Sequence, residues 1–304
     1  MSLIKIRDFV INIFDVVLSM IKIIFLTKIT FNFKLKSYRD QSLIILANGP
    51  SLNSTLENHE FIHKHNLLCV NYFGRTDEYV RFKPSFYVIT SLEYFFKDEK
   101  EELVTIRKRT LEDIATKTDW PLILFLPAKA KQQNEWKKIF TNNPNISIYY
   151  FNTTPISGFS WFSNFCYSKN IGMPRPHNVL IPSLILSIKM QFSEIYVAGA
   201  DHSWLKEINV TEENEVLLSQ KHFYDHEAKK QSKDKDMSFP KPMYQGGTTK
   251  TRKLHEVLEK FYYTFRSYWK IKSFSEAKGL KVYNITPISY IDAFERFDIS
   301  NKQN

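Results

Sequence analysis

The chain has little cysteine and little glycine. Its 304 residues include two Cys and eight Gly, and neither cysteine belongs to a CxxC pair. Cys69 and Cys166 stand among apolar or aromatic residues, so the sequence supports neither a disulfide scaffold nor a zinc site and indicates a reducing compartment. The glycines form neither a GxGxxG fingerprint nor a Walker loop with its lysine. The common signatures of dinucleotide and nucleoside triphosphate binding are therefore absent.

The composition also excludes some classes of protein. With 43% hydrophobic residues the chain is not disordered, and its length suffices for one large α/β domain with a sizeable core. A net charge of +10 and a pI near 9.3 suggest an anionic partner, such as nucleic acid, a phospholipid surface or a phosphorylated substrate. The basic residues are scattered and no nucleic-acid motif occurs, which argues against nucleic acid.

Residues 1–40 differ in composition from the rest. Apolar residues from Ile6 to Ile24 recur at helical spacing, with polar residues largely on the other side. Asp15 and Lys22 disfavour a spanning helix, and no small-residue cleavage site follows. A basic collar comes next, made of Lys28, Lys34, Lys36 and Arg39. We predict an amphipathic helix on the inner face of the cell membrane; docking on its own domain or on a second copy are the alternatives.

From residue 41 to 297, short apolar runs alternate with helical segments. Strands are expected at 43–47, 67–72, 85–90, 122–126, 146–151, 194–198 and 280–285. Helices are expected at 97–117, 129–140, 180–190 and 245–272. This alternation predicts an α/β fold with a mostly parallel, doubly wound, Rossmann-like sheet flanked by helices. Residues 298–304 are expected to form a tail.

The first apolar run ends in a tight turn, Asn48-Gly49-Pro50-Ser51. Ser54 and Glu57 have the spacing of a helix capping box just after it. A strand, a glycine turn and a helix N-terminus together offer backbone N–H groups to phosphate or ribose. We therefore predict a nucleotide site here, in which Gly49 leaves room for the ligand. An ordinary turn between strand and helix is the alternative.

A second candidate loop follows the apolar run 194–198. It contains Asp201 and His202, which could bind a ribose, orient a base or act as one, although Asp201 could simply cap a turn. A companion motif with His222 and His226 lies further on. The charged, proline-bearing stretch that follows predicts a lid-like insertion over about 205–245. Asp234-Lys235-Asp236 within it is interpreted as solvated charge, so no metal site is predicted.

Several of these segments occur together in a known family. The chain resembles the bacterial sialyltransferases of glycosyltransferase family 42 and the related nonulosonate transferases of the motility accessory factor group. The resemblance covers roughly residues 42–292. It rests on ANGPSL, on Asn71 after the second strand, on EIYVAGAD, on Tyr244-x-Gly and on VYNITPIS. It implies a GT-A-like variant of the Rossmann-like fold, a CMP-activated sugar as donor, and neither a cofactor nor an essential metal.

The resemblance also assigns nucleotide contacts. They would be made by Asn48, Gly49, Pro50, Ser51 and Asn71, with Thr90 or Ser91 after the third strand.

One position departs from the family pattern. The family's general-base histidine would fall at Gly247. Another group must then accept the proton, and we rank His202 first because it follows a rigid strand. His222 ranks second because a closing lid could bring it in, and Asp201 ranks third.

Three further side chains are expected to bind the substrate. Tyr224 and Tyr244 could donate hydrogen bonds to the departing phosphate, and packing within the lid is their alternative role. Arg175 could pair with that phosphate or with an anionic sugar.

The sequence thus predicts a membrane-associated bacterial glycosyltransferase with a glycan or lipid-linked acceptor in envelope polysaccharide or lipopolysaccharide assembly, and leaves a homo-oligomer open. One alternative is a pyrophosphokinase or other phosphotransferase, since related pterin diphosphokinases share the glycine-proline-serine loop. The other is a non-catalytic basic adaptor.

Overall fold

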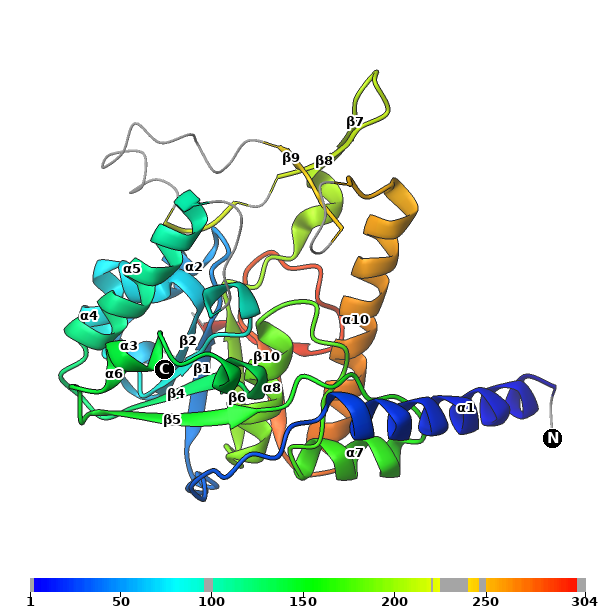
Figure 1. Ribbon diagram of the computed structural model, residues 1–304, viewed down its shortest axis with the longest axis horizontal. Helices are drawn as coiled ribbons and strands as arrows, with labels where there is room; N and C mark the ends of the chain where they lie inside the picture. Colours follow the sequence, from blue (N-terminus) through cyan, green and yellow to red (C-terminus); the bar gives the residue numbers. More distant parts are fainter. Residues whose placement is uncertain (1–2, 96–100, 220, 225–239, 246–249, 300–304) are drawn as a thin grey trace.

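A single parallel sheet organises the molecule. The computed structural model describes residues 3–95, 101–219, 221–224, 240–245 and 250–299 (Figure 1). In this part of the chain the main sheet has eight strands in the order β11-β10-β6-β1-β2-β3-β4-β5, and all neighbours are parallel. The strands are β1 (Ser42–Leu46), β2 (Asn66–Val70), β3 (Phe86–Val88), β4 (Leu122–Pro127), β5 (Ile146–Phe151), β6 (Glu194–Ala198), β10 (Lys281–Asn284) and β11 (Glu295–Arg296). The predicted fold class is confirmed.

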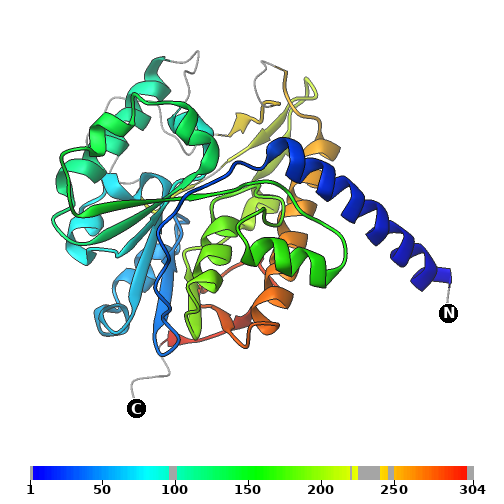
Figure 2. The same ribbon diagram turned by 60° about the horizontal axis from the view of Figure 1, so that its bottom comes forward.

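Helices cover both faces of this sheet (Figures 1 and 2). They are α1 (Leu3–Leu26), α2 (Leu52–Leu56), α3 (His59–His63), α4 (Asp77–Phe82), α5 (Glu101–Lys117), α6 (Lys137–Phe140), α7 (Ser160–Ser168), α8 (Leu180–Lys189) and α10 (Leu254–Glu276). Alternate residues of β1 pack into the two different cores. Leu43 and Ile45 join residues of α7, α8 and α10, whereas Ile44 and Leu46 join residues of α2, α3 and α5. Coverage of both faces explains why the strands are continuous apolar runs.

Short 3-10 helices follow several strands at the carboxyl edge of the sheet. They are η1 (Asn71–Arg75), η2 (Leu92–Tyr94), η3 (Ala128–Gln132) and η4 (Ser203–Glu207).

A small antiparallel sheet lies beside α10. Its strands are β7 (Ile208–Val210), β8 (Val216–Leu218) and β9 (Lys241–Pro242). Val216 and Leu218 pack against Val257 and Phe261 of α10. The described part of the predicted lid-like insertion therefore contains this small sheet, which packs against α10. Residues 225–239, with Asp234-Lys235-Asp236, lie outside the described residues.

Three local predictions are wrong. The capping box does not form, because α2 already begins at Leu52 and Ser54 Oγ donates to the Ser51 carbonyl at 2.8 Å. The expected helix over 129–140 is split into η3 and α6. The long helix starts at Leu254 instead of residue 245; before it, the Gln245 N–H donates to the Lys250 carbonyl at 2.9 Å and Tyr244 forms a bridge with Thr251. Helix α7 and strand β11 were not predicted.

Helix α1 turns its polar side toward the domain. It runs beside α7, and its N-terminal part projects from the molecule (Figures 1 and 2). Ser19 is its one buried residue in the described chain, and Ser19 Oγ exchanges two 2.9 Å hydrogen bonds with the backbone of Ser157. Asn12, Asp15, Val16, Lys22 and Ile23 are also partly covered, while the other large apolar side chains of the helix are exposed. By length and composition alone, this helix could cross a membrane.

Candidate functional site

The two candidate loops lie side by side at the carboxyl edge of the sheet. After β1 the chain builds β2 to β5 on one side, and it then builds β6, β10 and β11 on the other. Because β1 and β6 are parallel neighbours, the loops that follow them leave the sheet at the same edge. Ligands of open α/β sheets bind at such a topological switch point. Residues 48–51 and 199–202 are therefore the centre of the candidate site.

Gly49 is where the two loops touch. Its N–H donates to the Gly199 carbonyl at 2.8 Å, and Ser51 Oγ donates to Asp201 Oδ2 at 2.9 Å. A Cβ at position 49 would lie 2.1 Å from Asp201 Oδ2 and 2.4 Å from the Gly199 oxygen. The space beside Gly49 is thus filled by the neighbouring loop, and is not left open for a ligand as the sequence suggested. Pro50 is exposed at the tip of the turn.

Three buried oxygens at this edge have no hydrogen-bond partner among the described residues. They are Asn48 Oδ1, Asn71 Oδ1 and Thr90 Oγ1. These residues follow β1, β2 and β3, which are neighbours in the sheet. Asn48 Nδ2 donates to the Val70 carbonyl at 3.2 Å, which fixes the orientation of this amide. A buried polar atom without a partner costs about 1–3 kcal/mol, so three together indicate a place that a polar molecule completes.

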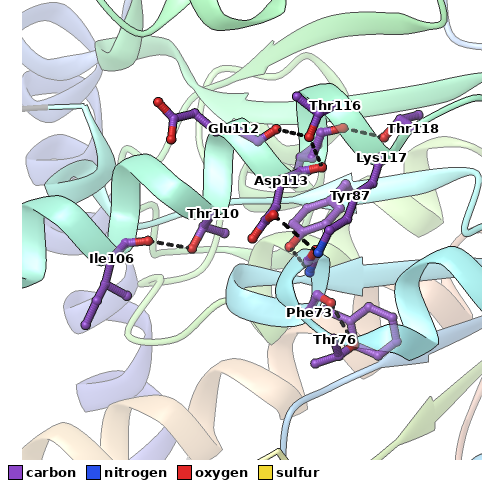
Figure 3. Close-up of polar contacts among 12 residues, drawn as sticks. Phe73, Thr76, Tyr87, Ile106, Thr110, Glu112, Asp113, Thr116, Lys117 and Thr118 are labelled. Carbon is purple, nitrogen blue, oxygen red and sulfur yellow. Dashed lines mark hydrogen bonds and ion pairs between the residues drawn. The ribbon is translucent and has the colours of Figure 1, made fainter. Parts of the chain in front are cut away.

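The backbone of Asn71 is held in place by a tyrosine of the neighbouring strand. It has a φ of +50°, in the left-handed region. The hydroxyl of Tyr87 on β3 donates to the Asn71 carbonyl and accepts from the Gly74 N–H, the latter at 2.8 Å. Figure 3 shows Lys117 of α5 reaching the same turn, with Nζ 3.5 Å from the Gly74 oxygen and 3.2 Å from Asp113. Burial keeps the pKa of Tyr87 well above its ordinary value, so it remains a neutral donor.

Residues 222–224 return to the first loop. The N–H of Phe223 donates to the Asn48 carbonyl at 3.1 Å, and its ring lies 5.7 Å from that of Phe73 in η1. The rings of His222 and Tyr224 stack with centroids 5.1 Å apart. The structure therefore brings His222 and Tyr224 beside the Asn48 loop. His226 lies outside the described residues.

Asp201 is the carboxylate at the switch point. Burial raises its pKa above the ordinary value, and hydrogen bonds from the Ser51 hydroxyl and N–H partly oppose this rise. The backbone carbonyl of Asp201 accepts from the Tyr290 N–H at 2.9 Å. A partly desolvated carboxylate on a braced loop is suited to accepting a proton from a hydroxyl group.

His202 is in a different setting. Its Nε2 lies 2.6 Å from the Tyr268 hydroxyl and 3.2 Å from Asn178 Nδ2, which also donates to Tyr268 at 2.7 Å. The Tyr268 hydroxyl therefore donates to Nε2, and the proton of the neutral ring sits on Nδ1. Burial lowers the pKa of His202 to about 3. Because Nε2 already has donors, these contacts favour a positioning role, and its role as the base stays a prediction.

The segment after β10 braces the same loop. Thr286 Oγ1 accepts from the Ala200 N–H at 3.0 Å, and Ser289 Oγ donates to the Ala200 carbonyl at 2.6 Å. Asn284 Nδ2 in turn donates to Ser289 Oγ at 3.1 Å. The last predicted strand and the turn after it therefore support the Asp201 loop.

Three predicted residues lie further from the switch point. Ser91 precedes η2 at the end of β3. Tyr244 forms an antiparallel bridge with Thr251 ahead of α10, and 47% of its surface is exposed. The Arg175 guanidinium lies 4.7 Å from the ring centroid of Tyr263 on α10. Position 247, where the resembled family has its histidine, is outside the described residues.

Sequence reasoning missed the surroundings of Arg175. His177 is near this arginine, and the charges of Arg252 and Lys260 also act on it. Arg252 and Lys260 are 75 or more positions away in the sequence, and no motif connects them with His177. No spacing signal could have found this group before the chain was folded.

The described residues offer no evident metal site. They contain no group of three or more His, Cys, Asp or Glu placed to hold a metal ion. Two surface hollows flank the site, one beside α2 and residues 284–289 and one between η4 and α10. Neither is lined by the two loops, so the candidate site is defined by the unpartnered oxygens and the strand order.

An open parallel sheet with a polar site at its switch point is a scaffold used by many nucleotide-binding enzymes. No protein-family model matches this chain, and no curated protein does. Among solved structures, it is similar to a MAf glycosyltransferase from Magnetospirillum magneticum AMB-1, with a TM-score of 0.48 and 8% sequence identity. The similarity covers 95% of this chain and 39% of that one, so this chain spans well under half of its length.

Proposed function

We propose that this protein is a glycosyltransferase that takes a CMP-activated sugar of the sialic acid type and transfers it to a glycan or lipopolysaccharide acceptor of the cell envelope. The observation that carries the proposal is the set of unpartnered oxygens of Asn48, Asn71 and Thr90 at the switch point. The resemblance in the loop from Asn48 to Ser51 supports the choice of a nucleotide as ligand.

The chemistry of these oxygens favours a cytidine nucleotide. The amide oxygens of Asn48 and Asn71 only accept hydrogen bonds. Ribose hydroxyls and the exocyclic amino group of cytosine are donors, whereas a uracil-type base presents an acceptor oxygen at the same position. A pocket of acceptors therefore binds CMP more tightly than UMP.

The transfer step needs a base and a stabilised leaving group. The acceptor hydroxyl attacks the anomeric carbon, the bond from that carbon to the phosphate oxygen breaks, CMP departs, and the hydroxyl proton passes to the base. Asp201 is our first choice, because its pKa is raised and it stands at the switch point; His222, beside the Asn48 loop, is the second. The Tyr224 hydroxyl is a candidate donor to the phosphate. Because a monophosphate leaves with less charge than a diphosphate, we propose that such donors suffice without a metal.

Nucleotide binding tests the proposal directly. By calorimetry, CMP should bind more tightly than UMP, and both Asn48→Ala and Asn71→Ala should weaken CMP by about three- to tenfold, the contribution of one hydrogen bond. Asn53→Ala, an exposed asparagine on α2, is the matched control and should bind CMP like the wild type. Equal affinity for CMP and UMP, or unchanged CMP affinity in both site variants, would overturn the assignment.

We also propose that α1 attaches the protein to the cytoplasmic face of the inner membrane. The side of α1 that carries Ser19 lies against the domain, and most of the apolar side chains of the helix face outward. Trp161 and Phe165 on the adjacent α7 are 71% and 54% exposed and extend this apolar surface. Tryptophan is favoured at the headgroup level, and the lysines after α1 are attracted to anionic lipids. These features support a helix that lies in the membrane interface.

A further inference from the structure

A cluster of basic side chains lies between α10 and the segment before α8. We call Arg175, His177, Arg252 and Lys260 the basic cluster. Arg175 and His177 both lie on the ring of Tyr263, at centroid distances of 4.7 Å and 6.1 Å. Lys260 is one turn earlier on the same helix, and Arg252 comes just before its start. Ser267 Oγ of α10 donates to the Arg175 carbonyl at 3.4 Å, which holds this segment against the helix, and the charges of Arg175, Lys260 and Arg252 act on His177.

Positive charge exceeds negative charge in this cluster. Glu93 acts on Lys260, and the charge of Arg252 acts on Glu256. Both carboxylates are already engaged. Glu93 accepts from Arg107 at 2.7 Å, and Glu256 accepts from the first backbone N–H of the α10 cap at 2.8 Å. Three cations therefore face two carboxylates that have other partners.

The basic cluster faces the same edge of the sheet as the nucleotide loops. Glu93 lies in η2, three residues after Thr90, and its charge reaches Lys260. On the other side, Asn178 follows His177 directly and contacts His202 in the loop after β6. The basic cluster is thus linked to the segment after β3 through the charge of Glu93 and to the loop after β6 through Asn178.

His177 has an unused polar atom inside this cluster. Its Nε2 is buried and has no hydrogen-bond partner among the described residues. Burial, followed by the charges of Arg175, Lys260 and Arg252, lowers the pKa of His177 to about 4. At neutral pH the ring is therefore uncharged. An anionic oxygen would neutralise the surrounding charge and give Nε2 a partner.

We propose that Arg175, His177, Arg252 and Lys260 form a subsite for an anionic group of the substrate, a phosphate or a carboxylate, to which Nε2 of His177 donates a hydrogen bond. The identity of the substrate rests on the proposed function, but the anion subsite does not. An anion among the cations raises the pKa of His177, because it offsets the charges that disfavour the imidazolium ion. Anion affinity therefore increases as the pH falls toward 4, the pKa of His177 in the protein without a bound anion.

Inorganic phosphate is the first probe. In NMR titrations of the full chain, with the His177 signal assigned by loss in His177→Gln, saturating phosphate should raise the His177 pKa by about one unit or more. Lys260→Gln and Arg252→Gln should each weaken phosphate binding by about tenfold. Lys281→Gln removes the same charge at the amino end of β10, on the opposite edge, and should leave phosphate affinity unchanged. An unmoved His177 pKa, together with wild-type phosphate affinity in both cluster variants, would overturn the proposal.

Cytidine, CMP and free N-acetylneuraminate identify the source of the anion. If the subsite holds the nucleotide phosphate, Lys260→Gln weakens CMP but not cytidine. If it holds the sugar carboxylate, the same change weakens N-acetylneuraminate and leaves CMP unchanged; either result supports the subsite. Failure of the proposed function gives a different result: the protein then binds phosphate at the basic cluster but binds neither cytidine nor CMP. In that case the anion subsite stands and the nucleotide site does not.

Discussion

A single methyl group at position 49 should separate the two candidate loops. In Gly49→Ala the new carbon would lie 2.1 Å from Asp201 Oδ2 and 2.4 Å from the Gly199 carbonyl oxygen, whereas real Cβ contacts stay above 3.0 Å. The Asp201 side chain can rotate, but the second obstacle is backbone. Gly199 in turn packs against Leu52: a Cβ on Gly199 would lie 2.7 Å from the Leu52 Cβ. The loop after β6 therefore has little room to move away from Gly49.

The cost follows from the contacts that separation breaks. The hydrogen bond from the Gly49 N–H to Gly199 is neutral and contributes about 0.5–1.5 kcal/mol, and the one from Ser51 to the Asp201 carboxylate contributes about 1.5–3 kcal/mol. Losing both lowers the free energy of unfolding by about 2–4 kcal/mol. This is a substantial part of the 5–15 kcal/mol typical of folded domains. CMP affinity should fall with it, because the same loop carries Asn48.

Urea unfolding at pH 7 measures this loss. Gly279→Ala is the control, because position 279 has a φ of +69° but nothing within 4 Å of its missing Cβ, so that only backbone strain of about 1–2 kcal/mol is expected. Since Gly49→Ala and Ser51→Ala break a shared contact, the double variant should cost little more than Gly49→Ala alone. The reasoning fails if Gly49→Ala is no more destabilising than Gly279→Ala, or if the two loop changes are additive.

Three further outcomes are expected. Because the folded-state pKa of His202, about 3, lies below the ordinary 6.5, the wild type should lose stability as the pH falls from 6.5 toward 3. His202→Gln should remove about 2–3 kcal/mol of the stability loss between pH 7 and 4.5. If urea unfolding of the wild type and of His202→Gln depends on pH equally, His202 is not held as a neutral ring. Deletion of residues 1–26 should move the protein from sedimented anionic vesicles to the supernatant, while high salt should release the full chain only partly. If the deletion variant still binds vesicles but changes from dimer to monomer by light scattering, the apolar face of α1 belongs to a contact with a second copy. Asp201→Asn should lower sugar turnover by about 10²–10⁴-fold with CMP affinity nearly kept, and near-normal turnover would direct attention to His222.

The central strands of the main sheet were predictable because they are covered on both faces. The run from Leu43 to Leu46 has no polar residue, since its side chains enter two cores. Strands separated by helical segments imply parallel pairing, so the sequence also placed the candidate loops at the carboxyl ends of strands, but it did not predict the strand order that makes this edge a switch point. The loops after β1 and β6 could therefore be identified as candidates from the sequence.

The contacts between these loops could not be predicted. The sequence shows that Gly49 permits a close approach, but not that Asp201 and Gly199 make it. The contacts of His202 could not be predicted either, since Tyr268, whose hydroxyl donates to its Nε2, is 66 positions away in the sequence. The late start of α10 goes with backbone hydrogen bonds ahead of it, from Gln245 to the Lys250 carbonyl and from Arg252 to the Met243 carbonyl, which helical periodicity does not encode.

The position of α1 has a consequence for how an acceptor is found. Lys28 and Asn152 exchange hydrogen bonds of 2.8 Å and 2.9 Å just after α1 and β5, so the helix leaves the domain at the carboxyl edge of the sheet. If α1 holds the protein in the lipid headgroup layer and the acceptor is lipid-borne, as proposed above, the protein searches for that acceptor in two dimensions, with its loops at the edge from which the helix departs. Confinement of both partners to one layer acts like a tether and can raise the effective acceptor concentration to the order of millimolar. Each acceptor contact can then be weak, and a glycan that has received its sugar leaves quickly.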